Sequence, residues 1–246
     1  MEHKKDSGNL KQRRLRIAAG LLAVLIVCGV VIGVLYSRGG VPGDGRPRIV
    51  CIGDSLTYGS GVRETRETDA WPQVLERKLD GAYEVLNYGI SGATAQKSGD
   101  YPYNSKLWRK AKRCRGQIYI LMLGSNDTKP QNWNAEGVAD QLGQRVRELK
   151  RIPSAETVYL MIPPPVYKLS EEDEYAVYNI DGDRIRDELQ DIVRNVAEEN
   201  DVALIDLFTL LDGHPEYMVD GAHPGLEGNE IIAEHIAQVI RGEASE

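Results

Sequence analysis

Residues 48–59 read RIVCIGDSLTYG. Its first part, Arg48–Ile52, is an apolar run of strand length that is rich in β-branched side chains. A glycine, an aspartate and a serine follow directly, and Asp and Ser are residues that begin helices. The segment therefore predicts a buried strand whose carboxyl end delivers Ser55 to a sharp turn at the start of a helix.

Four more runs of this kind recur along the chain, and stretches with helical spacing separate them. The runs are Tyr83–Asn87, Gln117–Leu123, Thr157–Ile162 and Val202–Asp206. The helical stretches are Trp71–Leu79, Lys106–Lys112, Ala135–Arg151, Asp181–Glu198 and Leu226–Ile240. Strands that alternate with helices predict an α/β fold, in which right-handed crossovers build a five-stranded parallel sheet with helices on both faces.

The N-terminal segment Ile17–Tyr36 is apolar and carries no charged side chain. At about 1.5 Å per residue it spans about 30 Å, the thickness of a bilayer core, and it predicts one transmembrane helix. Six basic residues precede it, which places the tail, residues 1–16, in the cytoplasm and residues 37–246 outside the cell membrane. A cleaved signal peptide is the alternative, but the residues after Tyr36 lack a good cleavage pattern.

The Gly/Pro-rich residues 37–47 read as a flexible linker, and residues 48–242 as one folded domain. The chain has a net charge of −7; residues 1–16 contribute +4, so residues 37–246 carry −11. An acidic domain repels phosphate backbones, which argues against nucleic acid as a partner. Lipid contact is expected through residues 17–36 alone.

Three cysteines, Cys28, Cys51 and Cys114, are expected to be unpaired thiols in apolar surroundings. There is no CxxC pair and no zinc-ligand spacing, so we expect no metal site.

Residues suited to catalysis follow successive strands, at the edge of a parallel sheet where ligands bind. Ser55 follows the first run, the glycine-bearing segment 87–94 the second, and Asn126 the third. Glycines let backbone N–H groups approach a ligand, and a side-chain amide can donate to an oxyanion. Each motif alone fits an ordinary cap or loop as well.

The segment 220–224, DGAHP, follows the fifth run and supplies an acid–base pair. A carboxylate at Asp220 can orient the imidazole of His223, which can then remove the serine proton. The other histidines suit this role less: His3 lies in the tail, His214 lacks the same loop, and His235 lies on a predicted helix.

The four blocks GDSLTYG, NYGISG, GSND and DGAHP together resemble those of the SGNH (GDSL) hydrolases, from about Arg48 to Ile240. The resemblance implies a flavodoxin-like three-layer α/β/α sandwich and a serine esterase that needs no metal or organic cofactor. It also implies roles for the residues in these blocks. Ser55 would be the nucleophile, with His223 as base and Asp220 as its partner, and Ser55, Gly92 and Asn126 would form the oxyanion hole.

Substrate contacts are expected from Asp54, Tyr101, Trp108, Trp133 and Tyr167, although such aromatic rings suit packing as well as sugar stacking. The blocks are most similar to those of bacterial carbohydrate esterases, which implies removal of O-acetyl groups from extracellular or cell-wall carbohydrate. The alternatives are a lysophospholipase or thioesterase, a membrane-tethered binding module without catalysis, and a structural or signalling membrane protein.

Overall fold

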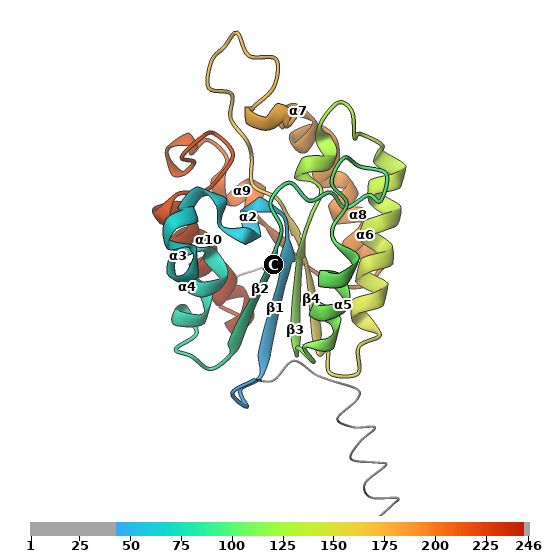
Figure 1. Ribbon diagram of the computed structural model, residues 1–246, viewed down its shortest axis with the longest axis vertical. Helices are drawn as coiled ribbons and strands as arrows, with labels where there is room; N and C mark the ends of the chain where they lie inside the picture. The colour runs from blue at the N-terminus through green and yellow to red at the C-terminus, as the bar shows by residue number, and fades with distance from the viewer. Residues whose placement is uncertain (1–42, 244–246) are drawn as a thin grey trace, which may run out of the picture. The chain divides into compact units, whose positions relative to one another are not determined.

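The computed structural model describes residues 43–243, which fold around one parallel sheet (Figure 1). The order across the sheet is β2-β1-β3-β4-β5, and every neighbouring pair is parallel. The predicted five-stranded parallel sheet is therefore confirmed, and each strand begins and ends within two residues of its predicted position. The strands are β1 (Arg48–Gly53), β2 (Glu84–Gly89), β3 (Ile118–Met122), β4 (Thr157–Ile162) and β5 (Ala203–Asp206).

Helices connect the strands, and the five predicted helical stretches are all helical. The α-helices are α2 (Ser55–Tyr58), α3 (Arg66–Asp69), α4 (Trp71–Lys78), α5 (Ser105–Arg113), α6 (Ala135–Lys150), α7 (Gly182–Arg184), α8 (Gln190–Glu199), α9 (Leu207–Leu211) and α10 (Leu226–Arg241). Shorter turns are η1 (Ser60–Thr65), η2 (Ser125–Thr128), η3 (Val177–Asn179) and η5 (Pro215–Tyr217), and a π-helical turn, η4 (Ile185–Leu189), joins α7 to α8.

The sheet has a hydrophobic layer on each face, because alternate residues of a strand point to opposite sides. Val50 and Ile52 of β1 belong to the cluster that packs against α5, α6 and α8. Ile49 and Cys51 belong to the cluster that packs against α4 and α10. Figure 1 shows these two groups of helices on opposite sides of the strands. The expected three-layer α/β/α order is therefore present.

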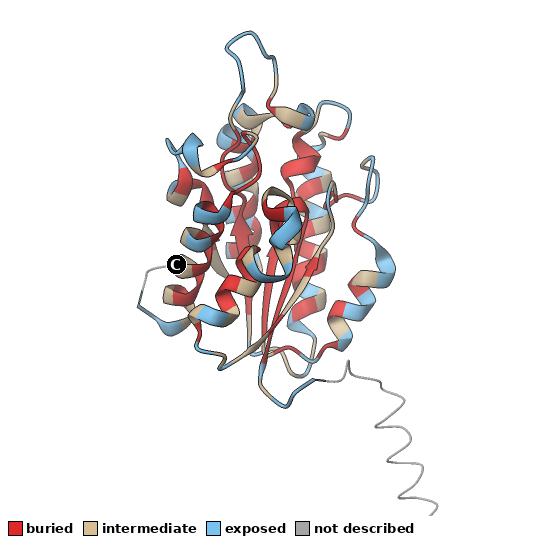
Figure 2. Ribbon diagram, turned by 60° about the vertical axis from the view of Figure 1, so that its left-hand side comes forward, coloured by how far each residue is buried: buried red, intermediate tan, exposed pale blue. Residues whose placement is uncertain are grey.

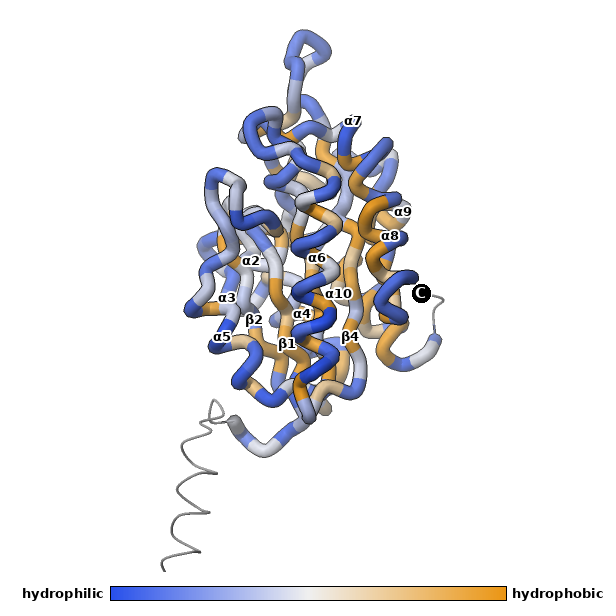
Figure 3. Tube along the Cα trace, turned by 90° about the vertical axis from the view of Figure 1, so that its right-hand side faces the viewer, coloured by the Kyte–Doolittle hydropathy of each residue, from blue (hydrophilic) through white to orange (hydrophobic). Residues whose placement is uncertain are grey.

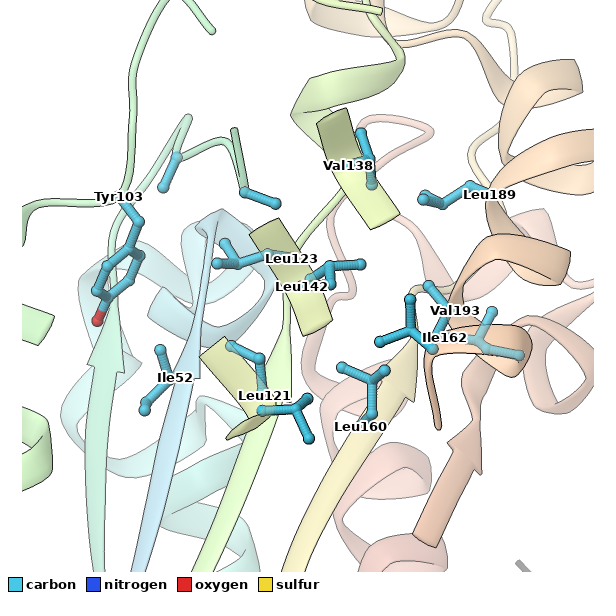
Figure 4. Close-up of a cluster of buried hydrophobic side chains, with 14 of the residues drawn as sticks. Ile52, Tyr103, Leu121, Leu123, Val138, Leu142, Leu160, Ile162, Leu189 and Val193 are labelled. Carbon is cyan, nitrogen blue, oxygen red and sulfur yellow. The ribbon is translucent and has the colours of Figure 1, made fainter. Parts of the chain in front are cut away.

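Burial is greatest along the central strands. All residues of β1 and β3 are buried, whereas the edge strands β2 and β5 are partly exposed. Figures 2 and 3 show the buried and apolar residues gathered along the strands and on the helix faces toward them. In Figure 4, Leu121 and Leu160 of the sheet face Leu142 of α6 and Val193 of α8. Such all-apolar strands are typical of a parallel sheet that helices cover on both faces.

The strand order creates a crevice at the carboxyl ends of β1 and β3. The chain runs from β1 outward to β2 and then returns to the other side of β1 to form β3. Connections that leave two neighbouring strands in opposite directions open a crevice between them, and ligands of such sheets bind there. Ser55 follows β1 and Asn126 follows β3, so both lie at this crevice.

None of the helices within residues 43–243 combines the length and the hydropathy of a membrane span. The predicted tail (1–16) and anchor (17–36), and most of the linker (37–47), lie outside the described residues, as do His3 and Cys28. Cys51 and Cys114 are buried and unpaired, as predicted.

Truncating a core leucine tests the packing between the sheet and α6. Leu142 is fully buried, so Leu142→Ala should lower the free energy of unfolding by about 2–5 kcal/mol. Leu226 is 62% exposed on α10, and Leu226→Ala should change it by less than about 0.5 kcal/mol. Urea unfolding of both variants measures the difference, and equal effects would contradict the packing described here.

Candidate active site

Ser55 is the first residue of α2, where the chain turns sharply out of β1. Asp54 caps the helix, because its side chain accepts a hydrogen bond from the backbone N–H of Leu56 at 2.9 Å. Ser55 itself is 8% exposed. At the first position of a helix a backbone N–H has no partner within the helix, so Ser55 presents both a hydroxyl and a free N–H to the crevice.

His223 and Asp220 complete a chain of hydrogen bonds that begins at Ser55. The Ser55 Oγ lies 2.9 Å from Nε2 of His223, and Nδ1 of His223 lies 2.7 Å from Oδ2 of Asp220. Both are ordinary hydrogen-bond distances. The carboxylate favours the tautomer in which Nδ1 carries the proton, and this leaves Nε2 free to accept the serine proton.

The loop that carries the histidine is fixed by hydrogen bonds to the backbone. Asp220 accepts from the N–H groups of Ala222 and His223 at 3.1 and 2.8 Å. Burial opposes ionisation of Asp220, but the hydrogen bonds from the His223 ring and these two amides hold its pKa below the usual value. The carboxylate is thus ionised over a wide pH range and can stabilise a protonated His223.

Asn229 of α10 ties this loop to the helix layer. It is 1% exposed, and its side-chain amide donates to the carbonyl oxygens of Pro224 and Gly225, each at 2.8 Å. Its side-chain oxygen accepts from the N–H of Trp71, the first residue of α4, at 2.8 Å. One buried amide therefore joins the histidine loop to two helices.

Gly92 brings a second backbone donor to the crevice. Its φ of +80° is a conformation that other residues rarely adopt, so glycine is required for this turn. Among the described residues, none accepts a hydrogen bond from its N–H. Asp127 anchors the segment that follows, because its buried carboxylate accepts from the N–H groups of Ala95 and Gln96 at 2.7 and 2.9 Å.

Asn126 contributes a side-chain amide from η2. Its Nδ2 lies 3.3 Å from Asp54 Oδ2 and 3.2 Å from the carbonyl oxygen of Ala93. Both distances are longer than usual, so these bonds are weak and a stronger acceptor can replace them. The carbonyl oxygen of Asn126 accepts from the Asn132 side chain at 2.9 Å, which fixes its backbone.

These groups line a cleft of about 490 Å³. Ser55, Gly92, Asn126, Asp220 and His223 all contribute to its wall, so the structure brings the predicted triad and oxyanion residues together. The other lining residues are Ser60, Arg63, Ser91, Lys129, Tyr178 and Ile180.

The five expected substrate contacts are not among the residues that line this cleft. Asp54 is fully buried under Ser55 as the cap of α2. Trp108 is buried on α5, where its indole N–H donates to Glu148 at 2.7 Å.

Of the three remaining aromatic rings, two pack against the core. Trp133 packs against the core cluster on the side of α6. Tyr167 packs on the opposite side, with its hydroxyl donating to the carbonyl oxygen of Leu211 at 2.7 Å. Tyr101 is 53% exposed and lies beside Gly92, one of the residues of the cleft wall.

The other described histidines lie elsewhere. His214 is exposed and pairs with Glu216 at 2.8 Å, and His235 is half-buried on α10, as its helical setting indicates.

Sequence reasoning missed several residues of the cleft, and Tyr178 is the most closely placed of them. Its ring meets that of His223 edge to face, with centroids 5.4 Å apart, and its hydroxyl lies 3.5 Å from Asp220 Oδ2. Tyr178 and Asn179 both have positive φ, which is uncommon for residues other than glycine. The rule that ligand-binding residues follow strands applies to this segment after β4 too, and could have indicated it.

The arrangement supplies a nucleophile, a base and donors for an oxyanion. A serine hydroxyl that is hydrogen-bonded to an imidazole, which is hydrogen-bonded to a carboxylate, has the geometry that acyl transfer requires. Within residues 43–243, no cluster of three or more His, Cys, Asp or Glu side chains could hold a metal ion.

Comparison with known proteins points to one family. Residues 51–231 match the GDSL-like lipase/acylhydrolase family. An acetylxylan esterase of Xylanibacter ruminicola is 30% identical over 220 residues, a match that covers 81% of this chain and 44% of that enzyme. This chain therefore spans less than half of the length of the acetylxylan esterase. The isoamyl acetate-hydrolyzing esterase 1 homolog of Homo sapiens is 25% identical over 221 residues, with 81% and 83% covered.

Solved structures show the same fold. A carbohydrate acetylesterase from Sinorhizobium meliloti superimposes with a TM-score of 0.66 at 20% identity, covering 80% of this chain and 99% of that chain. A putative arylesterase from Agrobacterium tumefaciens gives a TM-score of 0.64 at 24% identity, with 80% and 100% covered.

The buried carboxyl of Asp54 should make stability depend on pH. Burial raises its pKa from 3.8 to about 6, against the hydrogen bond from Leu56 and the charge of His223. Because the folded state binds this proton more tightly than the unfolded state, the protonated carboxyl contributes fully to stability below pH 4. This contribution to the free energy of unfolding, about 3 kcal/mol in all, is lost as the pH rises through 6. The unfolding free energy of the wild type, measured relative to Asp54→Asn, should therefore fall between pH 4 and 7. Parallel pH profiles for the two proteins would contradict this.

Proposed function

Because this chain belongs to the GDSL-like lipase/acylhydrolase family, we propose that it is a serine esterase that removes small acyl groups, chiefly O-acetyl, from extracellular or cell-wall carbohydrate. The observation that carries the proposal is the unbroken hydrogen-bond chain from Ser55 through His223 to Asp220. The Ser55 end of this hydrogen-bond chain lies in an open cleft, which Gly92 and Asn126 also line.

Acylation begins when His223 takes the proton of the Ser55 hydroxyl through Nε2. The Ser55 oxygen attacks the ester carbonyl and forms a tetrahedral intermediate, while Asp220 stabilises the imidazolium. His223 then gives the proton to the leaving alcohol oxygen of the sugar. The acyl group remains on Ser55 as an ester.

The negative charge of the intermediate falls on the former carbonyl oxygen. The N–H groups of Ser55 and Gly92 and the Nδ2 of Asn126 are the donors for it. Because the amide of Asn126 makes only long bonds to Asp54 and Ala93, it can give one up for an oxyanion at little cost. A donor of this kind typically contributes about 3–4 kcal/mol to lowering the barrier.

Hydrolysis of the acyl-enzyme repeats the same proton transfers with water. His223 removes a proton from water, the hydroxide attacks the ester on Ser55, and the serine leaves with the proton that His223 returns. The acid product is released into the open cleft, and the residues return to their starting state.

The cleft and the relatives support a small acyl group on a polar alcohol. Ile180 is the only apolar aliphatic side chain among the described lining residues, so a long acyl chain has little surface to bury. The acetylxylan esterase and the isoamyl acetate-hydrolyzing esterase homolog both carry acetate esters in their names. The proposal that the alcohol is a carbohydrate rests on the similarity to the acetylxylan esterase.

We also propose that residues 17–36 anchor the chain in the cell membrane, with residues 1–16 in the cytoplasm and the esterase domain on the outer side. The apolar run of bilayer length and the basic residues before it support this arrangement. A tethered esterase of this kind meets polymeric substrates at the cell surface.

Removing the nucleophile should abolish hydrolysis. Ser55→Ala should lower kcat/KM on p-nitrophenyl acetate by at least about a thousandfold, because no acyl-enzyme can form. Ser98→Ala, an exposed serine outside the cleft, is the matched control and should keep full activity. Circular dichroism checks that both variants are folded. Replacing the acetate ester by the decanoate ester tests the acyl-chain length that the enzyme prefers. Undiminished turnover in Ser55→Ala would remove Ser55 from the mechanism.

The anchor should keep the full chain with the membrane. After lysis, the protein should sediment with membranes, resist extraction by high salt and be released by detergent, because apolar insertion is not screened by ions. A periplasm- or surface-active reporter fused after Glu246 should be active. Release by salt alone, or activity of a reporter that works only in the cytoplasm, would contradict the proposed topology.

A further inference from the structure

The cleft around Ser55 carries positive charge in a domain that is strongly acidic. Arg63 and Lys129 line it, and Asp220 is the one carboxylate among the described lining residues. That carboxylate is bonded to His223 and is not available as a partner for them. Residues 37–246 carry a net charge of −11, so two cations at the site are a local reversal of the charge of the domain.

The backbone next to Arg63 is fixed against the histidine loop. A Cβ on Gly61 would come within 2.2 Å of the carbonyl oxygen of Pro224, so only glycine permits this approach. Val62 is 7% exposed and anchors the turn in the protein. Arg63 is therefore held at the cleft wall, with its side chain exposed and, within residues 43–243, without a hydrogen bond or ion pair of its own.

Lys129 is placed by the turn that carries Asn126. Its carbonyl oxygen accepts from the N–H groups of Asn132 and Trp133 at 2.8 and 3.1 Å, which fixes the backbone. Its side chain is 12% exposed, and its Nζ lies 3.8 Å from Asp100. This contact is long, and the Asp100 carboxylate already accepts from the Asn132 side chain at 2.8 Å. Lys129 can therefore bind a further anion.

The charge changes sign on the other side of Tyr178. This residue also lines a second cavity of about 620 Å³, together with Asp173 and Glu174 and no lysine or arginine among its described lining residues. The segment between β4 and α7, which holds these residues, rises above the carboxyl end of the sheet (Figure 1). An anion therefore fits beside Ser55, and a polyanion that continued past Tyr178 would meet two carboxylates.

We propose that the ester hydrolysed at Ser55 is carried by an anionic sugar, whose carboxylate or phosphate binds to Arg63 and Lys129. This inference rests on the proposed esterase function and names the substrate class of the same site. Arginine suits such a group because its planar fork pairs with two oxygens, and a largely buried lysine adds a charge that solvent screens little. A neutral sugar ester leaves Arg63 without a partner and Lys129 with only its long contact to Asp100.

Binding to the Ser55→Ala protein tests the proposal without turnover. The probes are methyl glucuronoside mono-O-acetate, the matched methyl glucoside mono-O-acetate and glucose 6-phosphate mono-O-acetate. Calorimetry should give a Kd for at least one charged probe about tenfold lower than that of the neutral one, a preference that falls as salt is raised. Comparing the affinities of the two charged probes shows whether the site prefers a carboxylate or a phosphate.

In the same background, Arg63→Gln should reduce this preference about two- to threefold and Lys129→Gln about three- to fivefold. The control is Arg109→Gln, which removes an exposed charge on α5 outside the cleft and should leave the preference unchanged. Equal affinity for charged and neutral probes, the absence of any binding, or the same preference in Arg63→Gln and Lys129→Gln as in the control would overturn the proposal. Anion-selective binding without hydrolysis of any of these esters by the wild type would contradict the esterase function alone.

Discussion

The hydrogen bond between Ser55 and His223 joins residues that are 168 positions apart in the chain, and much of the structure serves to hold it. The serine is fixed by the fully buried strand β1 and by the cap that Asp54 places on α2. The histidine is fixed by Asp220 and by Asn229, whose amide links the loop to α4 and α10. A shift of the layer formed by α4 and α10 relative to the sheet would break this bond, so packing of that layer on the sheet is a condition for catalysis.

Beneath the cleft lies a group of buried polar side chains that costs stability. Asp54 and Asp127 are fully buried, and burial raises the pKa of both, although backbone amides donate to each carboxylate. Asp127 fixes the segment after Gly92, and Asp54 contacts the amide of Asn126. The two carboxylates thus position the donors that an oxyanion needs. Proteins commonly sacrifice stability at a site in this way for geometry.

The sequence was sufficient for the sheet and for the central residues of the cleft. After their first residues, Arg48 and Gln117, the runs that became β1 and β3 are apolar on both faces, which is typical of strands that helices cover on both sides. Ser55, Asn126 and His223 could be grouped because the carboxyl ends of parallel strands meet at one edge. The aromatic residues were less predictable, because a tryptophan or tyrosine ring can stack on a sugar or pack in a core equally well. The structure packs Trp108 and Tyr167 against the two core clusters. Arg63, Lys129 and Tyr178 lie in loops, where no periodic pattern tells which way a side chain points.

The most direct test of the central claim is covalent labelling with a fluorophosphonate, read by mass spectrometry of the peptides. Such a reagent reacts with a serine only when a base removes its proton and donors stabilise the oxyanion that forms. We predict one label per chain on Ser55, and a labelling rate that falls steeply in His223→Ala. Label on another serine, no label in the folded protein, or an unchanged rate in His223→Ala would show that Ser55 and His223 do not act together.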